Sequence, residues 1–181
     1  GGARVAVVDY GCKRSILRRL ARAGASVTVY PHDVDADELA GYDGVLLSNG
    51  PGDPEPLEPQ TATVRELLGR VPVLGICLGH QLLGRATGFA TSKLPFGHRG
   101  ANHPVLERAT GRVLVTAQNH GFCVDASDAS EVTHVSLYDG TVEGLALPAE
   151  RARSVQFHPE AGPGPHDAWP LLDEWVSDLA A

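Results

Sequence analysis

Short apolar runs and longer amphipathic runs alternate through the first half of the chain. The apolar runs are rich in valine, leucine and isoleucine, and they occupy residues 4–9, 25–30, 43–48 and 71–76. Runs of this length and composition are typical of strands that are buried on both faces of a parallel sheet. Because amphipathic segments separate them, the sequence predicts strands that are joined by helices.

The amphipathic runs have the spacing of helices. In the first of them Gly24 stands where a glycine commonly ends a helix, and the apolar side chains form one stripe: Ile16, Leu17, Leu20 and Ala23. The pattern predicts two more helices, one on each side of the fourth apolar run. Helices of this kind cover both faces of a parallel sheet.

The second half of the chain changes character, because its strand-like runs follow one another without long helical segments. These runs cover residues 112–116, 133–138, 141–147 and 153–157. Asp139-Gly140 is a hairpin-turn signal, and residues 167–179 form a closing amphipathic helix. We therefore predict an α/β fold with an open, mostly parallel sheet, helices on both faces and an antiparallel extension, in one domain that spans residues 1–181.

The charge balance narrows the classes of function. The 181 residues include 15 basic and 22 acidic side chains, and the formal net charge of −7 argues against a surface for nucleic acid or anionic membranes. No apolar run approaches the ~20 residues that a bilayer-spanning helix needs. Three scattered cysteines leave at least one unpaired, which indicates a reducing and therefore cytoplasmic setting.

The sequence lacks the usual motifs for a nucleotide or a metal. No GxxxxGK[ST] loop and no dinucleotide fingerprint follows a predicted strand. His98 and His103 have no cysteine or carboxylate at ligand spacing. We therefore expect no cofactor and no metal in this domain, and any ATP with its metal would bind a partner chain.

Cys77 lies in the sharpest local motif of the chain. The segment Gly75-Ile76-Cys77-Leu78-Gly79 joins a buried strand to a helix and matches the G-x-nucleophile-x-G elbow, with cysteine as the nucleophile. The elbow needs glycines because the tight turn leaves no room for side chains. The helix N-terminus favours a thiolate at this position. A buried cysteine between turn glycines is the alternative, and the flanking strand and helix favour the nucleophile.

A thiolate nucleophile needs a base, and His158 is the best placed of eight histidines. It follows a predicted strand, and Pro159 favours an extended backbone before it. Glu160, two residues later, is close enough to orient the imidazole through a hydrogen bond. His-Pro-Glu alone is a weak signal, and it gains weight from the elbow.

The loop after the third apolar run can supply an oxyanion hole. It carries Gly50 and Gly52, whose backbone N–H groups can approach a ligand closely. The residue after the nucleophile, Leu78, supplies the second N–H in elbows of this type. Ligands bind at the carboxyl edge of parallel sheets, which favours a functional loop over a simple turn.

Four separated motifs in this order resemble the class I (triad-type) glutamine amidotransferases. They are SNGPGDP (48–54), GICLGHQLLG (75–84), QNHGF (118–122) and SVQFHPEAGPGPHD (154–167). The likeness covers nearly the whole chain and includes the family's flavodoxin-like fold. It is greatest to the glutaminase domain of the small chain of carbamoyl-phosphate synthetase, because of the segment FGHRGANHP (96–104) and the proline-glycine run after Glu160.

The resemblance implies the roles of individual residues. Cys77, His158 and Glu160 would form the catalytic triad. The residues that would hold glutamine are Gly50, Gly52, Leu78, Gln81, Asn119, Gly121 and Phe122. Gln81 follows Cys77 by one helical turn, so its amide can face the same pocket. Without the resemblance, residues 119–121 indicate only a turn.

The resemblance also implies an activity and a partner. The chain would hydrolyse L-glutamine to glutamate and ammonia and supply the ammonia to the large chain of a carbamoyl-phosphate synthetase, in pyrimidine and arginine biosynthesis. The further N-terminal domain that the family's small chain carries is expected to be absent. Two alternatives stay open: an amidotransferase for another synthase, of the anthranilate or GMP type, and a non-catalytic regulatory or scaffold domain.

Overall fold

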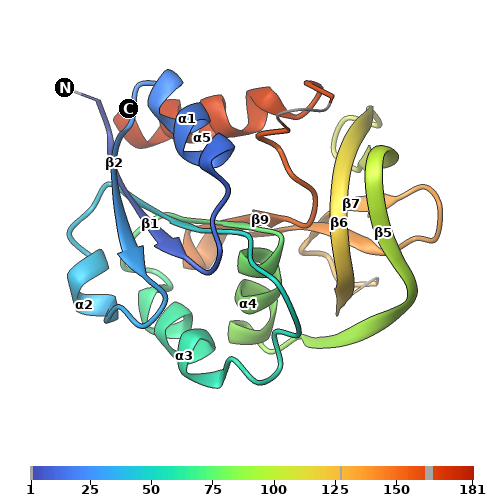
Figure 1. Ribbon diagram of the computed structural model, residues 1–181, viewed down its shortest axis with the longest axis horizontal. Coiled ribbons are helices and arrows are strands. Elements are labelled where there is room, and N and C mark those ends of the chain that lie inside the picture. Colours follow the sequence, from blue (N-terminus) through green and yellow to red (C-terminus); the bar gives the residue numbers. More distant parts are fainter. Residues whose placement is uncertain (1, 127, 162–164) are drawn as a thin grey trace.

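The computed structural model describes residues 2–126, 128–161 and 165–181, so part of the proline-glycine run after Glu160 lies outside the described residues. The strands in this part of the chain are β1 (Arg4–Asp9), β2 (Ser26–Pro31), β3 (Gly44–Leu47), β4 (Val73–Ile76), β5 (Ala90–Glu107), β6 (Val113–Asp125), β7 (Val132–Ser136), β8 (Val142–Leu147) and β9 (Ala152–Val155). They form one sheet in the order β2-β1-β3-β4-β9-β8-β7-β5-β6. The first five strands of this order, β2-β1-β3-β4-β9, pair in parallel. From β9 onward, through β8, β7, β5 and β6, the pairs are antiparallel (Figure 1). The predicted mixed sheet with an antiparallel extension is confirmed.

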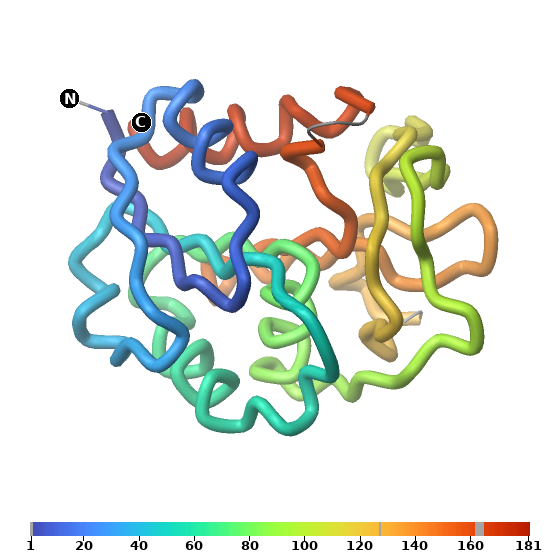
Figure 2. The backbone as a smooth tube through the Cα atoms, in the orientation of Figure 1, coloured from blue at the N-terminus to red at the C-terminus, as the bar shows by residue number. Residues whose placement is uncertain are grey.

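Helices cover both faces of the parallel strands. On one face lie α1 (Arg14–Arg22) and α5 (Trp169–Ala180), and on the other lie α2 (Ala36–Leu39), α3 (Glu58–Leu67) and α4 (Leu78–Ala86) (Figures 1 and 2). In the described part of the chain, no helix is long and apolar enough to cross a membrane.

Each face of the sheet has its own hydrophobic core, because side chains alternate along the strands. Val45 and Leu47 pack with the α2–α4 face, whereas Leu46 between them packs with the α1–α5 face. In α1 the buried residues are Ile16 and Leu20, as the stripe predicts. All five of these side chains are almost completely inaccessible to solvent, so the short apolar runs are buried on both faces.

Two glycines that the sequence marks as helix-ending or turn residues lie at the observed ends of helices and strands. Gly24 has a φ of +98° just after α1, which is the left-handed conformation of a helix-ending glycine. Gly140 has a φ of +74°, and its N–H donates to the carbonyl of Ser136 at 2.9 Å in the turn between β7 and β8. Both turns therefore depend on glycines that the sequence already marks.

The prediction missed the long strand β5 and was wrong about residues 119–121, which lie inside β6 and form no turn. Strand β5 contains two prolines and two glycines with positive φ, Gly97 and Gly100. Its register with β6 shifts between Lys93 and His98 and again between Gly100 and His103. Such irregularities break the period-2 pattern by which strands are recognised.

The carboxyl ends of neighbouring parallel strands bring distant segments together at one edge of the sheet. Strand β3 leads into the loop at residues 48–52, β4 into Cys77, and β9 into residues 156–158. The far half of β6 lies beside them, since the backbone N–H of His158 donates to the carbonyl of Ala117 at 2.9 Å. This edge is where doubly wound sheets bind their ligands.

Candidate active site

Cys77 occupies a strained turn between β4 and α4. Its φ of 55° and ψ of −107° are sparsely populated by residues with a side chain. A Cβ on Gly75 would lie 2.6 Å from the carbonyl oxygen of Gly79, and one on Gly79 would overlap the carbonyl of Leu47. The two glycines therefore permit the turn, as the elbow motif requires.

The sulfur of Cys77 points to β6 and to the segment after β9. The backbone N–H of Cys77 donates to the carbonyl of Val155 at 2.9 Å, which attaches the elbow to β9. Gln156 Nε2 donates to the sulfur at 3.6 Å, and the carbonyl oxygen of Asn119 lies 3.9 Å from the sulfur. With only 4% of Cys77 exposed, these contacts define the environment of the thiol.

His158 is held by a carboxylate on one side and faces the thiol on the other. Its Nδ1 lies 3.2 Å from Glu160 Oε1, and both side chains are almost completely buried. A Glu160 oxygen at Nδ1 favours the tautomer that leaves Nε2 available for the sulfur. Cys77, His158 and Glu160, which are 81 and 2 residues apart in the chain, are thus adjacent.

Opposing effects act on the charge of His158. Burial disfavours the charged ring, but the interactions with Cys77 and Glu160 favour it more, and together they raise the pKa of His158 to about 9. An imidazolium beside the sulfur stabilises a thiolate and can deliver a proton to a leaving group. The arrangement can therefore support both nucleophilic attack and general acid catalysis.

The loop after β3 lies across the cleft from the imidazole and is held by Asn49. Asn49 Oδ1 accepts from the backbone N–H of Lys13 at 3.1 Å, and its Nδ2 donates to the carbonyl of Gly11 at 3.3 Å. A Cβ on Gly50 would overlap the carbonyl of Tyr10, so only glycine fits there. Such a loop offers backbone N–H groups that are already ordered before a ligand arrives.

A cleft of about 600 Å³ joins these parts. Of the residues predicted to act on or bind a ligand, eight line it: Gly50, Gly52, Cys77, Gln81, Asn119, Gly121, Phe122 and His158. Glu160 lies behind His158 and contacts its ring. Leu78 does not line the cleft; its side chain lies against Gly50, and its backbone begins α4.

Gln156 is the residue of this site that the sequence analysis missed. Its Nε2 bonds the sulfur of Cys77, and its Oε1 accepts from Gln81 Nε2 at 3.0 Å. Gln81 Nε2 also donates to the carbonyl of Phe122 at 3.0 Å. The spacing of Gln156 and His158 could have revealed it, because alternate residues of an extended segment share a side.

Three cations at the cleft were also missed, since isolated Lys and Arg residues carry no sequence signal. They are Lys13, Lys93 and Arg99. They give the entrance a positive character that suits a ligand with a carboxylate.

His80 has no direct role at the sulfur. It is completely buried, its Nδ1 lies 2.7 Å from Ser154 Oγ, and burial lowers its pKa to about 3. The neutral ring fills the core beneath the elbow helix. Its position and its lowered pKa suit a packing role better than that of a base at the sulfur.

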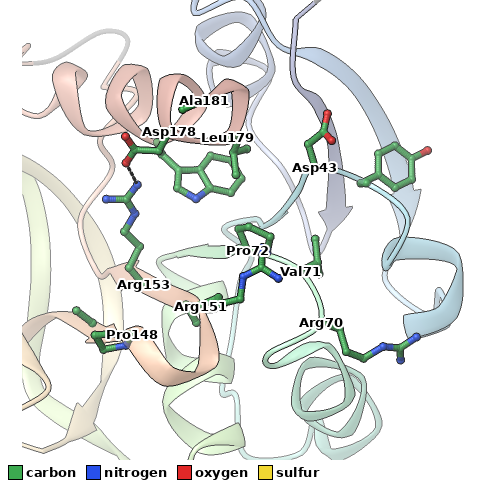
Figure 3. A pocket seen from close by; sticks show the side chains of 14 residues that line it. Asp43, Arg70, Val71, Pro72, Pro148, Arg151, Arg153, Asp178, Leu179 and Ala181 are labelled. Atoms are coloured by element: carbon green, nitrogen blue, oxygen red, sulfur yellow. Dashed lines mark hydrogen bonds and ion pairs between the residues drawn. The ribbon is translucent and has the colours of Figure 1, made fainter.

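A second hollow, of about 560 Å³, lies at the opposite, amino edge of the parallel strands (Figure 3). Arg70, Arg151 and Arg153 line it, and Arg153 pairs with Asp178 at 2.9 Å. None of the residues that the motifs single out lines this hollow. The chemistry-bearing side chains of the described chain are therefore concentrated at the carboxyl edge.

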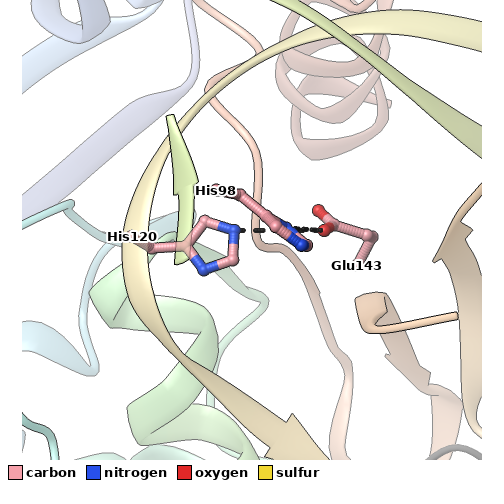
Figure 4. Close-up of side chains that lie close together, drawn as sticks. All are labelled: His98, His120 and Glu143. Atoms are coloured by element: carbon pink, nitrogen blue, oxygen red, sulfur yellow. Dashed lines mark ion pairs between the residues drawn. The ribbon is translucent and has the colours of Figure 1, made fainter. Parts of the chain in front are cut away.

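His98, His120 and Glu143 form a buried group whose potential ligand atoms all lie within 4.8 Å of one another (Figure 4). His98 has no carboxylate at ligand spacing in the sequence, but two carboxylates lie beside it in the structure. Its Nδ1 lies 3.3 Å from Glu143 Oε1, and its Nε2 lies 2.6 Å from Asp139 Oδ2. These carboxylates are about 40 residues away in sequence, and strand pairing brings them to His98.

The chain matches a family model and several curated relatives. Residues 6–177 match the model described as glutamine amidotransferase class-I. Carbamoyl phosphate synthase small chains from Bacillus caldolyticus and Methanopyrus kandleri are 50% and 51% identical, over 97% and 98% of this chain and 50% and 51% of the relatives. The small chain from Listeria innocua is 52% identical over 97% of this chain and 50% of the relative. The chain thus spans about half the length of these relatives.

Two solved structures show the same fold at low sequence identity. A protein described as a GMP synthase subunit, from Thermoplasma acidophilum, has a TM-score of 0.79 at 21% identity, covering 98% of this chain and 96% of that one. A glutamine amidotransferase from Thermotoga maritima has a TM-score of 0.70 at 17% identity, covering 99% and 94%. The sheet and its antiparallel extension are therefore a shared architecture.

Proposed function

Because this chain belongs to the class I glutamine amidotransferase family, we propose that it hydrolyses L-glutamine to glutamate and ammonia with Cys77 as nucleophile. The observation that carries the proposal is the strained elbow that holds the Cys77 sulfur beside His158, which is itself backed by Glu160. A thiol, an imidazole and a carboxylate in this order are the parts needed for acyl transfer.

In the first half of the reaction the Cys77 thiolate attacks the side-chain amide carbon of glutamine. A C–S bond forms, and the amide oxygen becomes an oxyanion that the backbone N–H groups of the Gly50–Gly52 loop and of Leu78 would stabilise. The His158 imidazolium gives its proton to the amide nitrogen. The C–N bond then breaks, ammonia leaves, and a glutamyl thioester remains on Cys77.

In the second half of the reaction water replaces ammonia. The neutral His158 removes a proton from a water molecule, which attacks the thioester carbon. The C–S bond breaks, and glutamate leaves as the Cys77 thiolate and the His158 imidazolium are restored. Glu160 stays ionised and keeps the ring oriented through both halves.

Glutamine would lie in the cleft with its side chain towards Cys77 and its amino-acid end towards β6. Gln81, Asn119, Gly121 and Phe122 line that part of the cleft, and Arg99 stands at its entrance. No cofactor takes part in these steps, and the chemistry needs none in this domain.

The partner would be the large chain of a carbamoyl-phosphate synthetase, which would use the ammonia with ATP. The identity of about 50% to small chains of that enzyme, from bacteria and from Methanopyrus, supports this partner. The setting would be the cytoplasm, where such biosynthesis takes place. Other synthases of the anthranilate or GMP type would be served by a chain with the same fold.

An assay of glutamate release tests the proposed function and its partner together. The complete natural polypeptide is given glutamine with and without a carbamoyl-phosphate synthetase large chain, ATP and bicarbonate. We expect glutamate in both cases and carbamoyl phosphate only with the large chain. Absence of glutamate in both would favour a non-catalytic scaffold, and glutamate without any effect of the large chain would favour another synthase as partner.

A further inference from the structure

Four buried polar side chains lie next to the cleft in the antiparallel part of the sheet, and one of them, His120, also lines the cleft. They are His98 on β5, Gln118 and His120 on β6, and Glu143 on β8. Glu143 is completely inaccessible to solvent, and at most 7% of each of the others is exposed. Burying so many polar groups is costly unless each has a partner.

The outer end of this group reaches the surface at Asp139. Asp139 Oδ2 lies 2.6 Å from His98 Nε2. On the other side of the ring, Glu143 Oε1 lies 3.3 Å from His98 Nδ1 (Figure 4). The Glu143 and Asp139 carboxylates outweigh the effect of burial and raise the pKa of His98 to about 9. His98 therefore holds a proton between two carboxylates.

The middle of the group is oriented by Glu143. Gln118 Nε2 donates to Glu143 Oε2 at 2.9 Å, so the amide oxygen of Gln118 faces the other way and lies 2.6 Å from His120 Nε2. An ionised Glu143 can only accept hydrogen bonds and so fixes this amide orientation, whereas a protonated Glu143, which burial favours by raising its pKa, would permit the reversed one. Because burial lowers the pKa of His120 to about 4, the neutral ring has a single N–H, and Gln118 places it on Nε2.

The inner end of the group reaches the sulfur. With its N–H on Nε2, the neutral His120 ring turns the Nδ1 lone pair to the carbonyl oxygen of Phe122 at 2.9 Å, so this oxygen accepts from Gln81 Nε2 and not from His120. The same Gln81 nitrogen donates to Gln156 Oε1, and Gln156 Nε2 donates to the sulfur of Cys77. Close polar contacts thus lead from Asp139 at the surface to the nucleophile, although His98 Nδ1 and Glu143 Oε1, 3.3 Å apart, form no hydrogen bond.

A metal ion is the competing explanation for two histidines and a glutamate in one place. A ligand histidine must offer a free lone pair, and both ring nitrogens of His98 face carboxylates. His120 Nε2 is 3.9 Å from Glu143 Oε1 but only 2.6 Å from Gln118 Oε1. The contacts of His98 Nε2 with Asp139 and of His120 Nε2 with Gln118 favour a polar relay, and because His98 Nδ1 and Glu143 Oε1 form no hydrogen bond, the test includes a metal analysis.

We propose that Glu143 and His98 are positioning residues. They act through this series of polar contacts, the relay, on the Cys77 thiol and on the part of the cleft that Asn119 and Phe122 form. Glu143 sets the orientation of Gln118, Gln118 sets the tautomer of His120, and that tautomer leaves the Phe122 carbonyl to accept from Gln81. The expected change in KM rests on the proposed function. The expected change in the reactivity of the Cys77 thiol does not, because it can be measured without turnover.

The test compares Glu143→Gln with a matched control. Glutamine at position 143 keeps the size of the side chain but can donate a hydrogen bond, so Gln118 is free to reverse. The control is Glu107→Gln, because Glu107 also lies beside a buried histidine, His134, at 3.6 Å in the same antiparallel part. Among the contacts of the described residues, that pair approaches the site only through the apolar contact of His134 with the ring of Phe157, at a centroid distance of 5.6 Å.

Two quantities are measured on the complete natural polypeptide: the rate at which iodoacetamide alkylates Cys77, and the KM and kcat for glutamine. In Glu143→Gln we expect the alkylation rate to change at least about threefold and the KM to rise about tenfold, the effect of losing a buried hydrogen bond. In Glu107→Gln both quantities should stay as in the wild type, even if the melting temperature falls equally in the two variants. Asp139→Asn, at the exposed end, should change the same two quantities in the same direction but less strongly. If Glu143→Gln does not fold, Asp139→Asn replaces it in the comparison.

Each result decides the proposal. If Glu143→Gln and Glu107→Gln changed the alkylation rate and the KM equally, the proposal would be overturned, because both substitutions would then act only by lowering the stability of the protein. A stoichiometric metal in the purified protein, lost together with reactivity in Glu143→Gln, would also overturn it in favour of a metal site. If the wild type did not hydrolyse glutamine but the alkylation rates still separated the variants, the proposed function would fail while the relay stood.

Discussion

At the scale of single residues, the proposed reaction needs a sulfur that attacks and a ring that moves protons, and the site holds both side by side. Cys77, His158 and Glu160 could be named from the sequence, because each follows a strand end and two of them lie in one short motif. Arg99 and the His98–Glu143 pair could not, because their partners are fixed by strand pairing between distant segments. Neither composition nor spacing records such pairings.

An electrophilic glutamine analogue should label Cys77 rather than the other two cysteines. Burial raises the pKa of Cys12 to about 11 and also raises the pKa of Cys123, so both are mainly protonated at neutral pH. Cys77 lies beside the charged His158 at the end of the cleft. Peptide mapping by mass spectrometry measures the distribution of the label. A label found mainly on Cys123 would mean that the wrong thiol has been assigned.

His158→Asn should damage turnover more than Glu160→Gln does. The imidazole transfers protons in both halves of the reaction, whereas the carboxylate only orients and charges the ring, so the difference in kcat should be about 10–10²-fold. Steady-state assays of both variants give the ratio. His80→Asn is the control, because His80 lies in the core beneath the elbow. A larger loss of kcat in a folded His80→Asn than in His158→Asn would require another base.

The charge on His158 should make the stability of the protein depend on pH. Its pKa is raised from 6.5 in the unfolded chain to about 9 in the folded protein, so the stabilisation is fully present below about pH 6.5 and is lost as the pH rises through about 9. The melting temperature of the wild type should therefore exceed that of His158→Asn by more at about pH 6 than at about pH 10. An equal difference at both values would show that His158 is not charged in the folded state.

At the scale of elements, the turn between β4 and α4 is the most fully predictable part of the fold. Its glycines are visible in the sequence, and each has a backbone carbonyl where a Cβ would be. Strand β5 is the opposite case. Its prolines, glycines and two register shifts remove the regular alternation of apolar and polar residues. It forms a strand because it pairs with β6 and β7.

Gly79→Ala should disturb the elbow, whereas Gly41→Ala should not. A methyl group on Gly79 would overlap the carbonyl of Leu47, and overpacking of this kind costs about 1–3 kcal/mol. Nothing lies within 4 Å of the corresponding position on Gly41. The melting temperature should fall by about 2–4 °C per kcal/mol in the first variant only. Unchanged stability and activity in Gly79→Ala would mean that the elbow can relax more than its geometry suggests.

At the scale of the whole molecule, the fold gathers motifs that are far apart in sequence. The loop after β3, the elbow after β4 and the segment after β9 meet because parallel strands end at the same edge of a sheet. That convergence follows from the alternation of apolar and amphipathic runs, so this part of the site was predictable. The part of the cleft that β6 forms was not predictable, because it depends on the antiparallel extension, which brings β6 beside His158.

The most direct measurement of the central claim is the detection of a glutamyl thioester on Cys77 during turnover. The protein is mixed with glutamine, quenched with acid within the first turnovers, digested and mapped by mass spectrometry. We expect the glutamyl group on the peptide that contains Cys77, its release by hydroxylamine, and no thioester in Cys77→Ser, whose turnover should be abolished while its fold is retained. Glutamate production by Cys77→Ser at the wild-type rate, or a glutamyl group on Cys12 or Cys123 instead, would contradict the account.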